Sequence, residues 1–188
     1  MHSQSTAAAC AWPRQLDLSR NRSLLDVGGG SGAHAIGAVR QWPNLRAIVF
    51  DMAAVCELAS EYAKEAGYAN RVTAQAGDMW KDRFPDADLH FYSLVFHDWP
   101  EDKCRFLAKK SFDLLPRSGR IIIHEPLVND DRIGPLAPAL FSAVMLLWTE
   151  GRQYSGRELN EIVSGAGFAN IEVLETFGYW GIVTGIKV

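Results

Sequence analysis

The stretch SLLDVGGGSGAHAIGAVRQW, residues 23–42, joins a short apolar segment to a glycine-rich turn and then to a helical pattern. The apolar segment, residues 23–27, has the length of a buried strand, and the pattern after Gly32 keeps helical spacing until it stops before Pro43. Glycines let the backbone of such a turn approach a ligand, and the following helix points its N-terminus at that ligand. The stretch therefore predicts a strand, a ligand-binding turn and a helix.

The same alternation continues along the chain. Further strands are predicted for residues 45–50, 71–76, 88–96 and 120–125, and helices for residues 33–42, 53–66, 101–115, 136–148 and 156–166. This order is typical of βαβ units around a mostly parallel sheet. The last two strand patterns, residues 170–177 and 179–188, have no helix between them and are expected to pair antiparallel. The predicted fold class is α/β, Rossmann-like, with an antiparallel hairpin at its end.

Composition excludes several classes of protein. With 188 residues, 48% of them hydrophobic, the chain is long enough for one domain with a core, and its net charge of −3 offers no basic field for nucleic acid. The most apolar window, residues 133–148, contains two prolines and is shorter than the roughly 20 residues that cross a membrane. Three scattered cysteines and a polar start without a signal peptide indicate a cytoplasmic protein. No metal is expected, since His97, Asp98 and Asp102 are spaced as a turn rather than a ligand set.

Three acidic residues follow or end the first three predicted strands, and they bear on the choice of cofactor. The glycine turn also satisfies the G-x-G-x-x-[GA] pattern of nicotinamide dinucleotides. However, Asp26 lies just before the glycines, where it would repel a pyrophosphate but suits a cofactor with an ammonium and a sulfonium. Asp51 can accept ribose hydroxyls, and Asp78 adds a third acid at the same edge. These acids favour S-adenosylmethionine; the alternative for each of them is an ordinary helix cap.

Five motifs follow one another along the chain, and together they resemble a known family. They are LLDVGGGSG (24–32), VFDMAAV (49–55), AGDMW (76–80), FHDWPEDKCRFLAKKSFDLLPRSGRIIIHEPLV (96–128) and SGRELNEIVSGAGF (155–168). In this order they resemble the class I S-adenosylmethionine-dependent O-methyltransferases and, more narrowly, the caffeate and acetylserotonin O-methyltransferases and their bacterial relatives. The resemblance implies a seven-stranded sheet with an antiparallel last strand and helices on both faces. It also implies methyl transfer to a hydroxyl of a small aromatic molecule.

The resemblance assigns roles residue by residue. It implies that Gly28 and its neighbours hold the methionine part of the cofactor, Asp51 the ribose, and Asp78 the adenine. The full set of cofactor residues expected on this basis is Ser5, Asp26, Gly28, Gly30, Asp51, Met52, Asp78, Met79, Ser93 and Trp99. The expected substrate-side residues are Met1, Met145, Trp148 and Gln153. Gln153 stands where the family often has a second glutamate beside its catalytic histidine.

The resemblance also implies that His97 is the general base and that Glu125 orients it. The residue pattern agrees, because His97 is expected to end the fourth strand and Glu125 the fifth, at the ligand-binding edge of an open α/β sheet. The pKa of a histidine, near 6.5, is well below that of a phenol, near 10, so proton removal is expected to accompany the attack on the methyl group. His90 and His124, inside predicted strands, are expected to be packed or solvated residues rather than catalytic ones.

The family normally carries an N-terminal helical domain that forms a dimer. Residues 1–20 resemble the linking helix that follows that domain, and residues 21–188 the catalytic domain, so the chain is expected to be a cut catalytic domain or a short form. A homodimer is expected where the N-terminal region is present. Without it, residues 133–148 are expected to be partly uncovered.

Other functions stay open. One alternative is a carbon or nitrogen methyltransferase of the same fold, and another is a non-catalytic module that binds S-adenosylmethionine. A nicotinamide-dependent dehydrogenase is a more distant alternative. Replacing His97 by alanine should abolish O-methylation but spare methylation of an acceptor that is already nucleophilic.

Overall fold

The computed structural model describes residues 2–188, with side chains from Ser5 onward. The chain forms two compact units, one ending at Phe91 and the other beginning at Tyr92.

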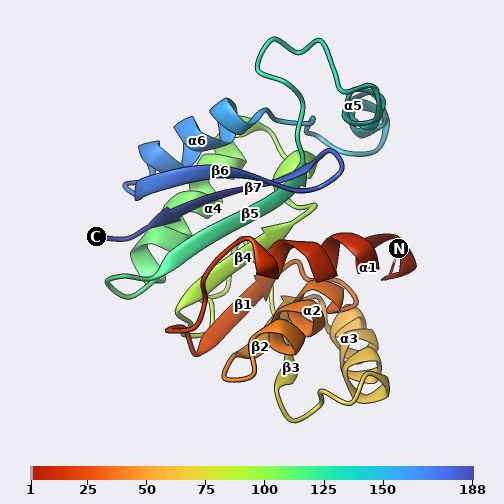
Figure 1. The fold of residues 1–188 in the computed structure, drawn as a ribbon, viewed down its shortest axis with the longest axis vertical. Coiled ribbons are helices and arrows are strands. Elements are labelled where there is room, and N and C mark those ends of the chain that lie inside the picture. The colour runs from red at the N-terminus through yellow and green to blue at the C-terminus, as the bar shows by residue number, and fades with distance from the viewer. Residues whose placement is uncertain (1) are drawn as a thin grey trace. The chain divides into compact units, whose positions relative to one another are not determined.

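The first unit is a small parallel sheet with helices (Figure 1). Its elements are α1 (His2–Ala11), the 3-10 turn η1 (Trp12–Arg14), β1 (Ser23–Val27), α2 (Ala33–Gln41), β2 (Arg46–Asp51), α3 (Ala53–Glu65) and β3 (Val72–Ala76). The strand order is β3-β2-β1, all parallel, with Leu25 opposite Ile48 and Val49 opposite Ala74. Parallel strands bring their carboxyl ends to one edge, so the residues that follow β1, β2 and β3 lie at the same edge of this sheet.

The core of this unit explains its sequence pattern. Leu24, Leu25 and Val27 are fully buried, as expected for a strand covered on both faces. Helix α1 packs closely on α2. Gly37 permits this approach, since a Cβ there would lie 2.2 Å from the carbonyl oxygen of Ala9. Trp12 is fully buried and its ring stacks on Phe91 with centroids 4.3 Å apart. The first helix is therefore an integral part of the unit's packing.

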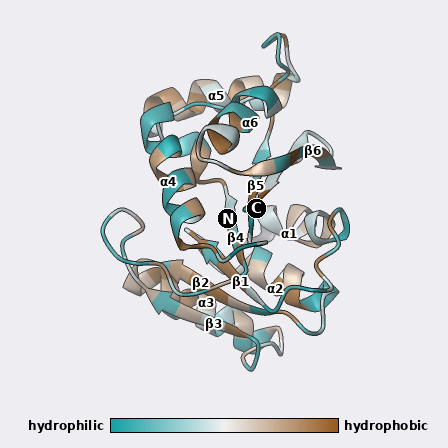
Figure 2. Cartoon of the chain, turned by 90° about the vertical axis from the view of Figure 1, so that its left-hand side faces the viewer, coloured by the Kyte–Doolittle hydropathy of each residue, from teal (hydrophilic) through white to brown (hydrophobic). Residues whose placement is uncertain are grey.

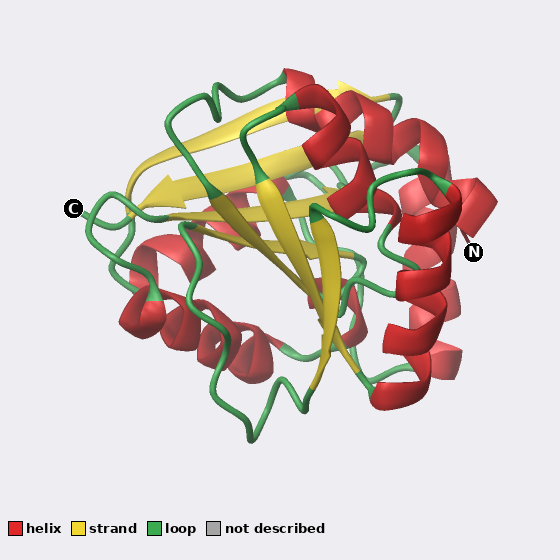
Figure 3. Cartoon of the chain, turned by 90° about the horizontal axis from the view of Figure 1, so that it is seen from below, coloured by secondary structure: helices red, strands yellow, loops and turns green. Residues whose placement is uncertain are grey.

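The second unit is built around an antiparallel sheet (Figures 1 and 3). Its elements are the 3-10 turn η2 (Phe96–Asp98), α4 (Glu101–Leu114), β5 (Arg120–Pro126), α5 (Leu136–Trp148), α6 (Gly156–Gly165), β6 (Ala169–Phe177) and β7 (Trp180–Ile186). The order is β5-β7-β6, and β7 pairs antiparallel with both neighbours. Gly178, with φ 59°, makes the turn of the hairpin. The predicted antiparallel ending is confirmed.

Strand β4 (Leu89–Ser93) crosses the division between the units, and here one prediction is wrong. The strand was expected to reach Phe96 and to be ended by His97, but it stops at Ser93, and His97 lies in η2. Leu94 has φ 57°, which takes the backbone out of the extended conformation. The other predicted elements are confirmed to within one or two residues at each end.

Helix α5 exposes much of its apolar surface. Figure 2, which colours residues by hydropathy, shows it as a largely hydrophobic helix, and Leu146, Leu147 and Trp148 are each at least 74% exposed. The expectation that residues 133–148 are partly uncovered is confirmed. Among residues 2–188, none of the helices has the length and apolar character needed to cross a membrane.

Candidate active site

The glycine turn follows β1 in the first unit and leads into α2. Gly28, Gly30 and Gly32 have φ values of 66°, 56° and 73°, a region that side chains with a Cβ resist. Gly29 meets a different constraint, since a Cβ there would lie 2.6 Å from the carboxyl carbon of Asp26. The turn therefore needs glycine at these positions, and its backbone is open to a ligand at the N-terminus of α2.

Asp26 is a fully buried carboxylate below this turn. Neither of its oxygens has a hydrogen-bond partner within the described part of the chain. Burial raises the pKa of Asp26 to about 7; the nearby Ala35 amide opposes the shift and the charge of Asp51 adds to it. A buried, unpaired carboxylate is unfavourable unless a cation approaches it. Asp26 therefore fits a ligand that carries an ammonium group.

Asp51 links the end of β2 to the glycine turn. Its Oδ2 accepts a hydrogen bond from the Gly30 amide at 2.9 Å, and its Oδ1 accepts one from the Met52 amide at 2.7 Å. A carboxylate has about four acceptor positions, so this one keeps capacity for further hydroxyl donors. Met52 is 69% exposed and offers an apolar surface next to it.

Asp78 follows β3, and its carboxylate turns back into its own loop. It accepts a hydrogen bond from the Trp80 amide at 2.8 Å and lies 3.2 Å from the Lys81 ammonium. The Trp80 amide and the Lys81 side chain hold the pKa of Asp78 below its ordinary value. Met79 is half-buried beside it, and Ser5, in α1, is also half-buried. The Asp78 carboxylate is thus held by its own loop, and its role at the adenine stays a prediction.

His97 lies in the second unit at the centre of a buried polar cluster. Its Nδ1 is 2.6 Å from Nε2 of Gln153 and 3.5 Å from Oε2 of Glu125, and its Nε2 is 3.5 Å from Oδ1 of Asp98. Phe141, from α5, stacks on the imidazole with centroids 6.4 Å apart. Burial lowers the pKa of His97, and Asp98 and the Gln153 amide oppose the shift. The imidazole is therefore held toward its neutral form, which is the form that accepts a proton.

Glu125, near the end of β5, contacts the backbone before His97 more closely than the imidazole itself. Its Oε1 accepts hydrogen bonds from the amides of Val95 and Phe96 at 3.0 and 3.1 Å, whereas Oε2 makes no hydrogen bond within the described part of the chain. Burial raises the pKa of Glu125 to about 8, and the backbone amides oppose the shift. Glu125 therefore holds the turn that carries His97.

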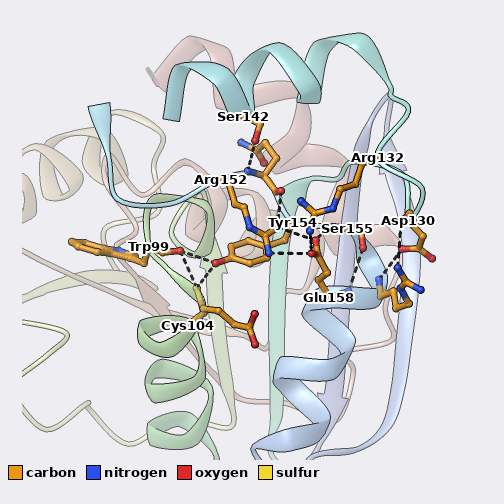
Figure 4. A network of polar contacts seen from close by, with 12 residues as sticks. Trp99, Cys104, Asp130, Arg132, Ser142, Arg152, Tyr154, Ser155 and Glu158 are labelled. Atoms are coloured by element: carbon orange, nitrogen blue, oxygen red, sulfur yellow. Dashed lines mark hydrogen bonds and ion pairs between the residues drawn. The ribbon is translucent and has the colours of Figure 1, made fainter. Parts of the chain in front are cut away.

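Gln153 is buried and enters the cluster from the segment between α5 and α6. The backbone N–H of Gln153 donates a hydrogen bond to Ser142 Oγ at 3.1 Å. The residues on either side are held by the network in Figure 4: Arg152 makes two hydrogen bonds of 3.0 Å to Glu158, and the Tyr154 hydroxyl donates to the Trp99 carbonyl at 2.8 Å. Glu158 in turn completes the capping box of α6 with Ser155.

The remaining predicted residues have different environments. Trp99 is half-buried, with the Lys103 ammonium 4.4 Å from its ring centroid, and Ser93 is half-buried at the end of β4. Met145 is 8% exposed but Trp148 is 82% exposed, so the two do not share one environment. Met1 lies outside the described residues.

His34, His90 and His124 are buried and outside the His97 cluster, which supports the prediction that His90 and His124 are packed rather than catalytic residues. Burial alone lowers the pKa of both His34 and His90 to about 3. Nε2 of His124 hydrogen-bonds Thr176 Oγ1 at 2.9 Å. Over residues 2–188 no group of three or more histidine, cysteine or acidic side chains is arranged to hold a metal ion.

Sequence reasoning from the motifs missed three participants. Asp98 Oδ1 lies 3.5 Å from Nε2 of His97, Phe141 stacks on the imidazole ring, and the Tyr154 hydroxyl donates a hydrogen bond to the Trp99 carbonyl. Asp98 adjoins His97 in the sequence and was detectable as a charged neighbour. Phe141 and Tyr154 had no local signal, because packing brings them to the site.

Comparisons with known proteins show which sequences and structures the chain is similar to. The model of a family described as "O-methyltransferase domain" matches residues 1–169. A curated 3-hydroxy-5-methyl-1-naphthoate 3-O-methyltransferase from Streptomyces sahachiroi is 38% identical over 97% of this chain and 54% of its own length. Acetylserotonin O-methyltransferase from Bos taurus is 36% identical over 91% of this chain and 49% of its own length. The chain thus spans about half the length of the curated relatives it matches.

Solved structures match the whole chain. An O-methyltransferase family 2 protein from Planctomyces limnophilus, crystallised with apigenin, has a TM-score of 0.92 and 34% identity over 100% of this chain and 60% of that one. Human N-acetylserotonin methyltransferase, crystallised with S-adenosylmethionine, has a TM-score of 0.86 and 30% identity over 100% of this chain and 52% of that one. The predicted α/β, Rossmann-like methyltransferase fold with antiparallel C-terminal strands is confirmed.

Proposed function

Because the chain belongs to the O-methyltransferase family, we propose that it moves the methyl group of S-adenosylmethionine to a hydroxyl of a small aromatic molecule, with His97 as the general base. The observation that carries this proposal is the buried imidazole of His97, whose pKa is lowered by burial and which lies in a cluster with Gln153, Glu125 and Asp98. The relatives support the acceptor class: one is named for the 3-hydroxyl of a naphthoate, and another was crystallised with apigenin.

The residues at the edge of the first unit would hold the cofactor. Asp26 suits its ammonium group, because that cation would neutralise a buried carboxylate that has no cationic side chain among the groups acting on it in the described chain. Asp51 would accept the ribose hydroxyls while it keeps the Gly30 amide. Asp78 and Met79 are proposed to contact the adenine. When bound, the cofactor supplies an activated methyl group on a sulfonium.

His97 would remove the acceptor's proton. The imidazole would take the hydroxyl proton while the acceptor oxygen receives the methyl group that the bound cofactor would supply. A protonated His97 is unfavourable in its buried site, so it would return the proton to solvent after transfer. Asp98, 3.5 Å from Nε2, would stabilise the imidazolium in the meantime.

His97→Ala tests the proposal. The rate of S-adenosylhomocysteine formation with a hydroxylated aromatic acceptor should fall about 100- to 10,000-fold. The affinity for S-adenosylmethionine, measured by calorimetry, should stay the same. His124→Gln is the matched control, because it changes a buried histidine bonded to Thr176 rather than to the His97 cluster.

Other outcomes would favour the alternatives. If His97→Ala keeps its rate on a carbon or nitrogen acceptor, His97 is not the base and the acceptor is not a hydroxyl. If the unaltered protein binds S-adenosylmethionine but forms no S-adenosylhomocysteine with any acceptor, it is a cofactor-binding module without catalysis.

Three further predictions are kept as proposals. We propose that residues 1–20 are a linking helix next to the catalytic domain, residues 21–188, that the protein forms a homodimer where the N-terminal region is present, and that it is cytoplasmic. The exposed apolar residues of α5 support the second of these.

A further inference from the structure

A groove in the second unit lies apart from the His97 cluster. It has a volume of about 620 Å³ and is lined by residues that follow β5, by the start of α6 and by the β6–β7 hairpin. The side chains that contact His97 lie outside its lining, namely those of Asp98, Glu125, Phe141 and Gln153. Binding sites for small molecules have volumes of roughly 300–1,000 Å³. The groove is therefore large enough for a small ligand, and its side chains indicate the kind of ligand.

Trp180 gives the groove a fixed aromatic surface. It is the first residue of β7, and its ring packs against the buried imidazole of His124 with centroids 4.8 Å apart. Nε2 of His124 lies 2.9 Å from Oγ1 of Thr176, which donates a hydrogen bond to the Trp180 carbonyl at 3.2 Å. The neighbouring Tyr179 adds a second ring, which is 40% exposed. Two aromatic rings in one groove favour a ligand with an apolar face.

Polar side chains accompany these rings in the groove. Within the described part of the chain, the side chains of Asn129, Asn160 and Glu175 make no hydrogen bond or ion pair, and the Tyr179 hydroxyl makes no hydrogen bond. An amide and a phenol hydroxyl both donate and accept hydrogen bonds, and a carboxylate accepts them. A ligand hydroxyl also donates and accepts, so these side chains can pair with several hydroxyl groups.

The charges of the groove disfavour an ionic ligand. Asp130 is engaged by the start of α6 (Figure 4): its Oδ1 accepts a hydrogen bond from the Arg157 amide at 3.2 Å, and its carbonyl oxygen accepts one from the Arg157 guanidinium at 3.3 Å. The Ser155 side chain holds the pKa of Asp130 below its ordinary value, and so does the Arg157 amide. An anion in the groove would meet the carboxylates of Asp130 and Glu175, and a cation would meet Arg157. A neutral ligand avoids both repulsions.

We propose that this groove is a second binding site, apart from the His97 cluster, for a neutral ring compound that carries several hydroxyl groups. The apolar face of the ligand would lie on Trp180 and Tyr179, and its hydroxyl groups would pair with Asn129, Asn160 and Glu175. Sugars and polyphenols share this chemistry. None of these five residues is proposed to act in methyl transfer, so a failure of this inference leaves the proposed function intact.

Nitrogen-15 NMR of the full chain labelled in tryptophan tests the proposal without cofactor. The chain has six tryptophans, and the indole N–H signal of Trp180 is identified by its loss in Trp180→Phe. Methyl glucopyranoside and catechol are the neutral probes, and inorganic phosphate is the anionic probe. At least one neutral probe should shift the Trp180 signal in a saturable way, whereas phosphate should not. Saturation by the glucoside alone identifies a sugar, saturation by catechol alone identifies a phenol, and saturation by both supports the shared chemistry.

Variants of the polar side chains test the predicted contacts. Asn160→Leu removes an amide at similar volume, and Tyr179→Phe removes only a hydroxyl, so each should weaken binding about two- to tenfold through the loss of one hydrogen bond. Glu175→Gln keeps an acceptor but removes the charge, so the affinity for a neutral probe should stay within about twofold. Asn44→Leu is the matched control, because it makes the same change as Asn160→Leu at an exposed position in the first unit. Thermal unfolding shows whether each variant is folded, and Tyr179→Phe carries the test if Asn160→Leu is not.

Three results would overturn the proposal. The first is that neither neutral probe shifts the Trp180 signal in a saturable way, whatever phosphate does. The second is that the folded Asn160→Leu and Tyr179→Phe variants bind the neutral probes as tightly as the unaltered protein. The third is that the probes shift the signal of Trp99 but not that of Trp180, since Trp99 lies two residues from His97 and outside the lining of the groove.

Discussion

Replacing Glu125 by alanine should destabilise the protein far more than replacing it by glutamine. Oε1 of Glu125 accepts hydrogen bonds from the amides of Val95 and Phe96, both buried. Alanine leaves both amides without an acceptor, at about 1–3 kcal/mol each, so the free energy of unfolding should fall by roughly 2–6 kcal/mol. Glutamine keeps a carbonyl oxygen at the same place, and its cost should be about 1 kcal/mol or less.

The pH dependence separates the backbone role of Glu125 from a charge role. Burial raises its pKa from the ordinary value of 4.5 to about 8, so between those pH values the unfolded chain has lost a proton that the folded chain keeps. The contribution of Glu125 to stability is therefore fully present below about pH 4.5 and is lost as pH rises toward about 8. Glutamine does not titrate, so Glu125→Gln should gain stability relative to the unaltered protein across this window.

Urea unfolding of the unaltered protein, Glu125→Gln and Glu125→Ala, at several pH values between about 5 and 8, measures both effects. Asp26 titrates in the same range, but it is common to all three proteins and cancels in the differences. The reasoning is refuted if the glutamine variant is as unstable as the alanine variant at neutral pH. It is also refuted if the unaltered protein and the glutamine variant show parallel pH dependences.

Two further predictions concern cofactor binding at Asp26 and the position of the turn that carries His97. Asp26→Asn should stabilise the unliganded protein above about pH 7, because it removes an unpaired buried charge, and should weaken S-adenosylmethionine binding at least tenfold. Thermal unfolding and calorimetry measure these effects, and unchanged affinity would contradict the ammonium-binding role. Gly151→Ala should displace the His97 turn, because the new Cβ would lie 2.3 Å from the His97 carbonyl oxygen and 2.4 Å from the Trp99 nitrogen. Its rate of methyl transfer should fall at least tenfold; an unchanged rate would show that the turn tolerates displacement.

The sequence alone determined the order and nature of the secondary structure. Strand Ser23–Val27 and helix Leu136–Trp148 have the predicted bounds, because hydrophobic periodicity and glycine or proline boundaries are local properties of the chain. The positive φ angles of Gly28 and Gly30 were likewise implied by their place in a tight turn. The five ordered motifs also identified the family.

Only the tertiary structure decided how the residues around His97 divide their roles. The prediction ended the fourth strand at His97, but the bonds from the Val95 and Phe96 amides to Glu125, about 30 positions along the chain, accompany an earlier end and a short turn. Gln153, 56 positions from His97, lies closer to the imidazole than Glu125 does, at 2.6 Å from Nδ1 against 3.5 Å. The physical reason is that local periodicity specifies which residues form an element, whereas buried hydrogen bonds join residues that only packing brings within about 3 Å.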